Sequence, residues 1–91
     1  MAVKQFQIRA AGKVQGVWYR QRTMETARKL NLTGFVRNEA DGSVYIEAQG
    51  EKDQIMKLIA WCRQGPEAAE VERVEWKEAG IKKFSSFDII R

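Results

Sequence analysis

The sequence predicts an α+β fold, an antiparallel sheet with two helices on one face, in the order β-α-β-β-α-β followed by a short terminal strand. Three observations predict it. Several short segments alternate apolar and polar residues, which is typical of half-buried strands. Two longer segments repeat apolar residues every three or four positions, as on one face of a helix. Glycine, asparagine and proline separate these segments, as expected for turns and caps.

The first part of the chain is predicted to form a strand, a loop and a helix. In residues 3–11, Phe6, Ile8 and Ala10 alternate with polar residues and form one apolar face. A loop with two glycines follows over residues 12–19, and a helix is expected over about residues 20–30, with Met24, Ala27 and Leu30 on one side. Asn31 is placed as a left-handed C-cap, with Leu32 as the apolar contact after it.

The remainder is predicted to form a hairpin, a helix and two further strands. Residues 34–38 and 43–49 flank an Asp-Gly pair suited to a tight turn. A helix over about residues 51–64 carries Ile55, Leu58, Ile59 and Cys62 at helical spacing, and Gly65-Pro66 ends it. The last strands are expected at 71–78 and 86–90. This order is the split βαβ arrangement.

Composition limits what the protein can be. Its 91 residues suit one domain spanning residues 1–91, and no apolar run is long enough to span a bilayer. The N-terminus lacks the apolar core of a secretory signal, so a cytoplasmic location is expected. A monomer is the default expectation for the oligomeric state. The single cysteine, Cys62, excludes an internal disulfide, and the lack of histidine excludes histidine bases and ligands. The acidic residues form no paired arrangement, so no metal and no cofactor are expected.

Charge is distributed unevenly along the chain. Residues 1–38 carry eight basic side chains and one acidic one, whereas residues 39–91 carry eight basic and eleven acidic ones. An electropositive first third suits an anionic partner, either a small phosphate ester or a nucleic acid backbone. Charge alone does not decide between them, because basic side chains can also be exposed to water without binding a partner. Lys82 and Lys83 are expected to be solvated in this way.

The loop before the first helix has the features of a phosphate-binding loop. A helix start leaves backbone N–H groups unpaired and carries partial positive charge. Glycines such as Gly16 let further amides turn toward one point. Arg20, in the first helical turn, could grip two phosphate oxygens with its forked guanidinium. A plain connecting loop with a surface arginine is the alternative.

Asn38 ends the strand that follows the first helix. In a split βαβ unit this strand and the first strand run parallel, so their C-terminal ends lie at the same sheet edge as the helix N-terminus. With one hairpin strand between them, they would stand roughly 9–10 Å apart, room for a phosphate and a water. An asparagine before a turn also often caps its own backbone, and geometry alone leaves the two interpretations equal.

Two motifs in these segments resemble those of a known family. Gly12-Lys13-Val14-Gln15-Gly16-Val17-Trp18-Tyr19-Arg20 is similar to the first acylphosphatase motif, G-x-V-Q-G-V-x-[FM]-R. The stretch from Gly34-Phe35-Val36-Arg37-Asn38 through Asp41-Gly42-Ser43-Val44 to Gly50 resembles the second, G-[FYW]-[AVC]-x-N-x₃-G-x-V-x₅-G. The resemblance extends over nearly the whole chain.

This resemblance implies a ferredoxin-like fold and the hydrolysis of acyl phosphates to carboxylate and inorganic phosphate. By position, Arg20 matches the residue that binds the substrate phosphate, and Asn38 matches the residue that orients the attacking water. The loop assisting Arg20 comprises Gln15, Gly16, Val17, Trp18 and Tyr19. Inorganic phosphate or sulfate would also fit the site. Tyr19 departs from the usual Phe or Met, and its hydroxyl beside the arginine could tune substrate access.

Two other functions are compatible with the order of elements. RNA-recognition motifs share it, but they stack bases on strand aromatics. Here the exposed face of strand 43–49 would present Tyr45 among Glu47 and Gln49, where a negative side chain repels a phosphate backbone. No nucleic acid partner is therefore expected. The second alternative is an accessory domain of a larger machine, which the presence of both motif residues disfavours.

Overall fold

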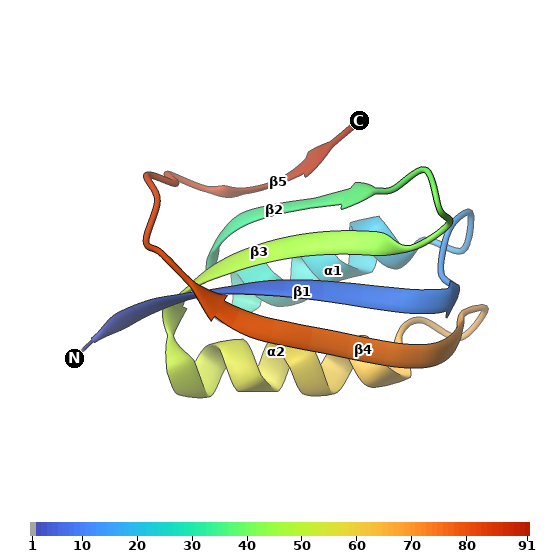
Figure 1. Ribbon diagram of the computed structural model, residues 1–91, viewed down its shortest axis with the longest axis horizontal. Helices are drawn as coiled ribbons and strands as arrows, with labels where there is room; N and C mark the ends of the chain where they lie inside the picture. Colours follow the sequence, from blue (N-terminus) through green and yellow to red (C-terminus); the bar gives the residue numbers. More distant parts are fainter. Residues whose placement is uncertain (1) are drawn as a thin grey trace.

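The computed structural model describes residues 2–91 and has the predicted order of elements (Figure 1). All boundaries agree with the prediction to within two residues. The elements are β1 (Val3–Lys13), α1 (Tyr19–Lys29), β2 (Thr33–Asn38), β3 (Val44–Glu51), α2 (Lys52–Gln64), β4 (Glu70–Ala79) and β5 (Phe87–Ile90). In Figure 1, α1 lies behind the sheet and α2 runs along β4 below it. With two helices packed against one sheet, the expected α+β architecture is confirmed.

The sheet has five strands in the order β4-β1-β3-β2-β5. β3 lies between β1 and β2, as predicted. The prediction of an antiparallel sheet is wrong for one pair, because β2 and β5 run parallel, with Val36 opposite Ile89. The reason is topological: β4 runs antiparallel to β1 and hence to β2, and the chain reverses direction before it reaches the β2 edge.

β1 is longer than predicted because it continues through Gly12. The register between β1 and β4 shifts between Ala11 and Gly12, as in a bulge, and pairing resumes to Lys13. Gly12 has a φ of 123°, and a Cβ there would lie 2.3 Å from the carbonyl oxygen of Glu70. Only glycine lets the two strands approach this closely. The bulge ends the sheet where the loop to α1 begins.

The core lies between the sheet and the two helices. The apolar face predicted for β1 is buried there together with Val44, Ile46 and Ala48 of β3, and the Ile55, Leu58, Ile59 and Cys62 side of α2 belongs to the same core. α1 buries Tyr19, Thr23 and Ala27, while Met24 and Leu30 are only partly buried. Its end is as predicted: Asn31 is left-handed, with a φ of 60°, and Leu32 is buried.

The opposite face of the sheet is partly covered by residues 80–86. The backbone N–H and carbonyl of Lys82 bond the side chain of Gln49, and its ammonium contacts Glu47 at 2.9 Å. Phe84 packs edge-on against Phe35. Lys82 is thus an anchor rather than a freely solvated residue, and Glu47, expected on an exposed face, is only 4% exposed. This covered face does not offer the open platform of an RNA-recognition motif.

Candidate active site

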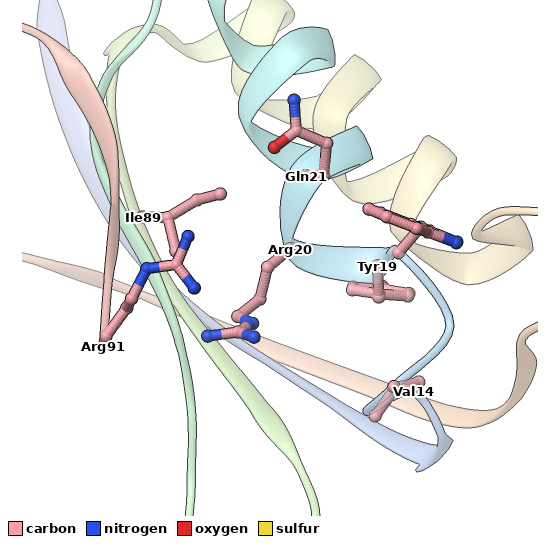
Figure 2. A pocket seen from close by; sticks show the side chains of 8 residues that line it. Val14, Tyr19, Arg20, Gln21, Ile89 and Arg91 are labelled. Carbon is pink, nitrogen blue, oxygen red and sulfur yellow. The ribbon is translucent and has the colours of Figure 1, made fainter.

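A cleft of about 270 Å³ opens at the sheet edge where α1 begins (Figure 2). It lies between the loop after β1, the first turn of α1 and the end of β5. The lining residues are Val14, Gly16, Trp18, Tyr19, Arg20, Gln21, Ile89 and Arg91. Its charged side chains are the two arginines, and no Asp or Glu side chain lines it. Such a cleft suits a small anion.

The loop before α1 holds its amides free. Gly16 and Trp18 both adopt left-handed conformations, with φ of 73° and 67°. Among the described residues, none of the backbone N–H groups of residues 15–20 has a hydrogen-bond acceptor. Trp18 is the N-cap residue, and its side chain does not cap the helix. Uncapped N–H groups at a helix start form an anion-binding site.

The individual loop residues differ in where their side chains go. Val17 is buried in the core, whereas Trp18 is 75% exposed at the cleft. Holding Trp18 left-handed is unfavourable for a non-glycine residue, and such strain often occurs at functional sites. The burial of Val17 anchors the loop while its amides remain available.

Gln15 does not use its side chain to line the cleft. Its Nε2 donates hydrogen bonds of 2.8 Å and 2.9 Å to the carbonyls of Glu39 and Ser43. These carbonyls belong to the turn between β2 and β3, which begins directly after Asn38. Gln15 therefore fixes the position of the loop relative to Asn38. Motif matching gave Gln15 a backbone role only, and this side-chain role was missed.

Asn38 is the last residue of β2 and is not among the eight residues that line the cleft. The parallel register ends at the pair Arg37 and Ile90, so Asn38 and Arg91 are the residues that directly follow it on the two segments. The Oδ1 atom of Asn38 is buried without a hydrogen-bond donor among residues 2–91. The Asn38 side chain does not cap the turn that follows it. In that turn, the backbone N–H of Ser43 donates to the carboxylate of Asp41 instead. An amide oxygen left without a donor can accept a hydrogen bond from a ligand or a water.

The hydroxyl of Tyr19 points away from the cleft, contrary to the suggestion that it tunes substrate access. It donates a 2.7 Å hydrogen bond to the carbonyl of Cys62, and the ring packs against Trp61. Burial, with a contribution from Cys62, raises the pKa of Tyr19 above its usual range. Burial likewise raises the pKa of the Cys62 thiol to about 12, which leaves it inert as a nucleophile.

The structure thus brings Arg20 and the loop amides together and sets Asn38 close by. Sequence reasoning missed Ile89 and Arg91, which form the opposite wall. No signal in the C-terminal sequence marked them, because their position depends on the parallel pairing with β2. Within residues 2–91, no group of three metal-ligating side chains gathers, and no helix is long and apolar enough to cross a membrane.

Comparison with known proteins agrees with this geometry. A model of the acylphosphatase family matches residues 6–89. The chain is 49% identical over 81 residues to an acylphosphatase from Acaryochloris marina. The aligned region covers 89% of this chain and 87% of the relative.

Solved structures are similar over the whole fold. An acylphosphatase from Coxiella burnetii superposes with a TM-score of 0.94 at 38% identity, covering 97% of this chain and 93% of the other. Full-length HypF, in a phosphate- and nucleotide-bound form, contains a region similar at a TM-score of 0.88 and 28% identity. This chain matches 99% of its own length there but only 12% of that longer protein.

Proposed function

The chain belongs to the acylphosphatase family, and on this premise we propose that Arg20 and the amides of residues 15–20 bind the phosphate of an acyl phosphate while Asn38 positions the attacking water. The products are a carboxylate and inorganic phosphate. One observation carries the assignment of residues. An uncapped helix start, a loop whose amides lack acceptors and an arginine without a partner lie at one cleft.

Binding of the phosphate follows from these groups. The N–H groups of the loop and the positive end of α1 attract an oxyanion. The guanidinium of Arg20 donates two parallel hydrogen bonds to phosphate oxygens. In phosphoryl transfer, charge is spread over the three equatorial oxygens in the transition state, so the same donors stabilise it.

The role of Asn38 is to hold water. Its Oδ1 is buried and lacks a donor, so it can accept a hydrogen bond from the water. A water bound there lies near the phosphate and attacks it from the side opposite the leaving group. A carboxamide is not basic, which makes Asn38 a positioning residue and not a general base.

The reaction needs little acid–base chemistry. Water oxygen forms a bond to phosphorus, and the bond between phosphorus and the carboxyl oxygen breaks. The carboxylate departs with the electron pair and needs no general acid, because it is a weak base. The water proton passes to a phosphate oxygen of the substrate itself. This route suits a protein without histidine.

The test is hydrolysis of benzoyl phosphate in excess chelator. Arg20→Ala should lower kcat/KM about 10³-fold or more and abolish competitive inhibition by inorganic phosphate. Asn38→Ala should lower kcat roughly 100-fold and keep phosphate inhibition, because it removes contact with the water only. Arg73→Ala is the matched control, since Arg73 is exposed on β4 and pairs with Glu75.

Each outcome assigns or removes a role. Normal turnover by Asn38→Ala would refute the water assignment. Unchanged phosphate inhibition in Arg20→Ala would refute the phosphate site. A pH–rate profile governed by a protein group near neutrality would contradict substrate-assisted proton transfer. Far-UV circular dichroism of each variant checks that the fold is intact.

A further inference from the structure

Two arginines of this protein stand apart from the rest. Of the eight in the sequence, six have partners in the described structure. Five form salt bridges, and the sixth lies over a tryptophan ring: Arg9, Arg22, Arg28, Arg37, Arg73 and, on Trp76, Arg63. Arg20 and Arg91 have no such partner among residues 2–91, and both line the same cleft. A guanidinium directed into a cleft without a counter-charge is suited to bind an anionic ligand.

Arg91 approaches the cleft from the wall opposite Arg20. Figure 2 shows its guanidinium extending from the end of β5 toward that of Arg20, across the opening. Ile89, two residues earlier, lines the same wall, so this face of β5 looks into the cleft. Arg91 and Asn38 directly follow the last pair of the parallel register, Ile90 and Arg37, and neighbouring strands lie about 4.8 Å apart.

The chemistry of the lining determines what lies between the two arginines. No acidic side chain lines the cleft, and two guanidiniums that face each other across it favour an anion bound between them. The cleft volume of about 270 Å³ leaves room for a phosphoryl group between the two walls. A doubly charged phosphoryl group can accept hydrogen bonds from both guanidinium groups at once.

We propose that Arg91 is a second phosphate-binding residue of this site, gripping the substrate phosphoryl group from the β5 wall opposite Arg20. This inference rests on the proposed function. Because Arg91 neighbours Asn38, it contacts a phosphate oxygen on the side from which water attacks. Guanidinium groups on opposite walls fix the rotation of the phosphoryl group, so that phosphorus faces the water held by Asn38.

Inorganic phosphate is the probe for the test. Its competitive inhibition constant is measured for the parent, Arg91→Ala and Arg91→Lys, together with the shift in Tm that phosphate produces. Arg91→Ala should raise the inhibition constant about tenfold or more and reduce the Tm shift. Lysine keeps the charge without the fork and should restore part of the affinity. Ile90→Ala is the control for β5, because Ile90 precedes Arg91 and points to the other face of the sheet.

The outcomes separate this inference from the proposed function. If Arg20→Ala loses phosphate binding while Arg91→Ala retains it, the role of Arg91 is refuted and the proposed function stands. If neither variant changes phosphate binding, the phosphate site itself is refuted. If Arg91→Ala weakens turnover of 4-carboxybenzoyl phosphate but leaves benzoyl phosphate and phosphate inhibition unchanged, Arg91 binds the acyl group and the inference is wrong. A lower Tm without phosphate and an unchanged inhibition constant would make Arg91 structural only.

Discussion

The side-chain hydroxyl of Tyr19 donates a 2.7 Å hydrogen bond to the main-chain carbonyl of Cys62. Tyr19 opens α1, and Cys62 lies in the last turn of α2, where carbonyls have no partner within the helix. One side chain therefore satisfies the end of the second helix and fixes the start of the first. Since the first turn of α1 also carries Arg20, the packing of α2 supports the position of the cleft.

Removal of this hydroxyl should affect stability and not activity. Tyr19→Phe leaves the Cys62 carbonyl without its donor, so we expect the free energy of unfolding to fall by about 1–2 kcal/mol. The hydroxyl points away from the cleft, so kcat and KM for benzoyl phosphate should stay within about twofold of the parent. Urea denaturation and steady-state kinetics measure the two effects. A large change in KM with unchanged stability would place the hydroxyl in the site.

The thiol of Cys62 should be unreactive in the native protein. It is fully buried, and burial raises its pKa to about 12, so almost no thiolate forms at pH 8. A disulfide reagent should label Cys62 only as fast as the protein unfolds enough to expose it. In guanidinium chloride, where the protein is unfolded, labelling should be rapid. Tyr19→Phe, being less stable, should label faster. Immediate labelling of the native parent would contradict the buried position.

Gln15 should control the alignment of the loop with Asn38. Gln15→Met keeps the length of the side chain but loses two hydrogen bonds to the turn after β2, about 1 kcal/mol each. We expect kcat to fall by about tenfold or more, with less effect on phosphate inhibition, because the loop amides remain. The control is Gln64→Met, on an exposed residue at the end of α2. Equal kinetics for both variants would show that the alignment does not depend on this contact.

Glu47 should make stability depend on pH in the acid range. Burial alone would raise the pKa of Glu47, but hydrogen bonds from Tyr45 and Lys82 outweigh it, and the pKa lies below the usual 4.5. When a carboxyl has a lower pKa in the folded state than in the unfolded state, its ionised form stabilises the fold. This contribution is fully present above the unfolded-state pKa, near 4.3, and is lost as the pH falls through the folded-state pKa.

Glu47→Gln removes this titration. The parent should be more stable than the variant at pH 7, and the difference should shrink as pH falls below about 4. Urea denaturation at pH 7, 5, 4 and 3 measures it. A difference that stays constant with pH would mean that the Glu47 carboxylate is not stabilised in the folded state.

The sequence predicted those parts of the molecule that depend on local chain geometry. Alternation and helical spacing placed every strand and helix, and the asparagine at 31 marked the end of α1 because a left-handed residue is needed there. Arg20 and Asn38 were indicated by their places at element boundaries and assigned roles by their match to the two family motifs. Their catalytic roles remain predictions.

The parts that were missed depend on contacts between distant segments. Arg91 reaches the cleft only because β5 pairs parallel to β2, and a short terminal strand does not reveal its partner. Gln15 gave no sign that its amide bonds a turn more than twenty residues away. The pairing of Lys82 with Glu47 likewise needs residues 80–86 to cross the sheet, which alternation does not encode.

The parallel pairing of β2 with β5 also has a consequence for folding kinetics. Arg28 of α1 donates a hydrogen bond to the carbonyl of Phe87, 59 residues away in the sequence. Closing the loop between these two residues costs chain entropy before the contact can stabilise the fold. Contacts between residues so distant in sequence slow the folding of small proteins. A partly folded state that contains β1, α1, β2 and β3 but lacks β5 would already hold the amide loop while lacking one wall of the cleft. In refolding, affinity for phosphate should therefore return after the helices have formed, when the last strand docks.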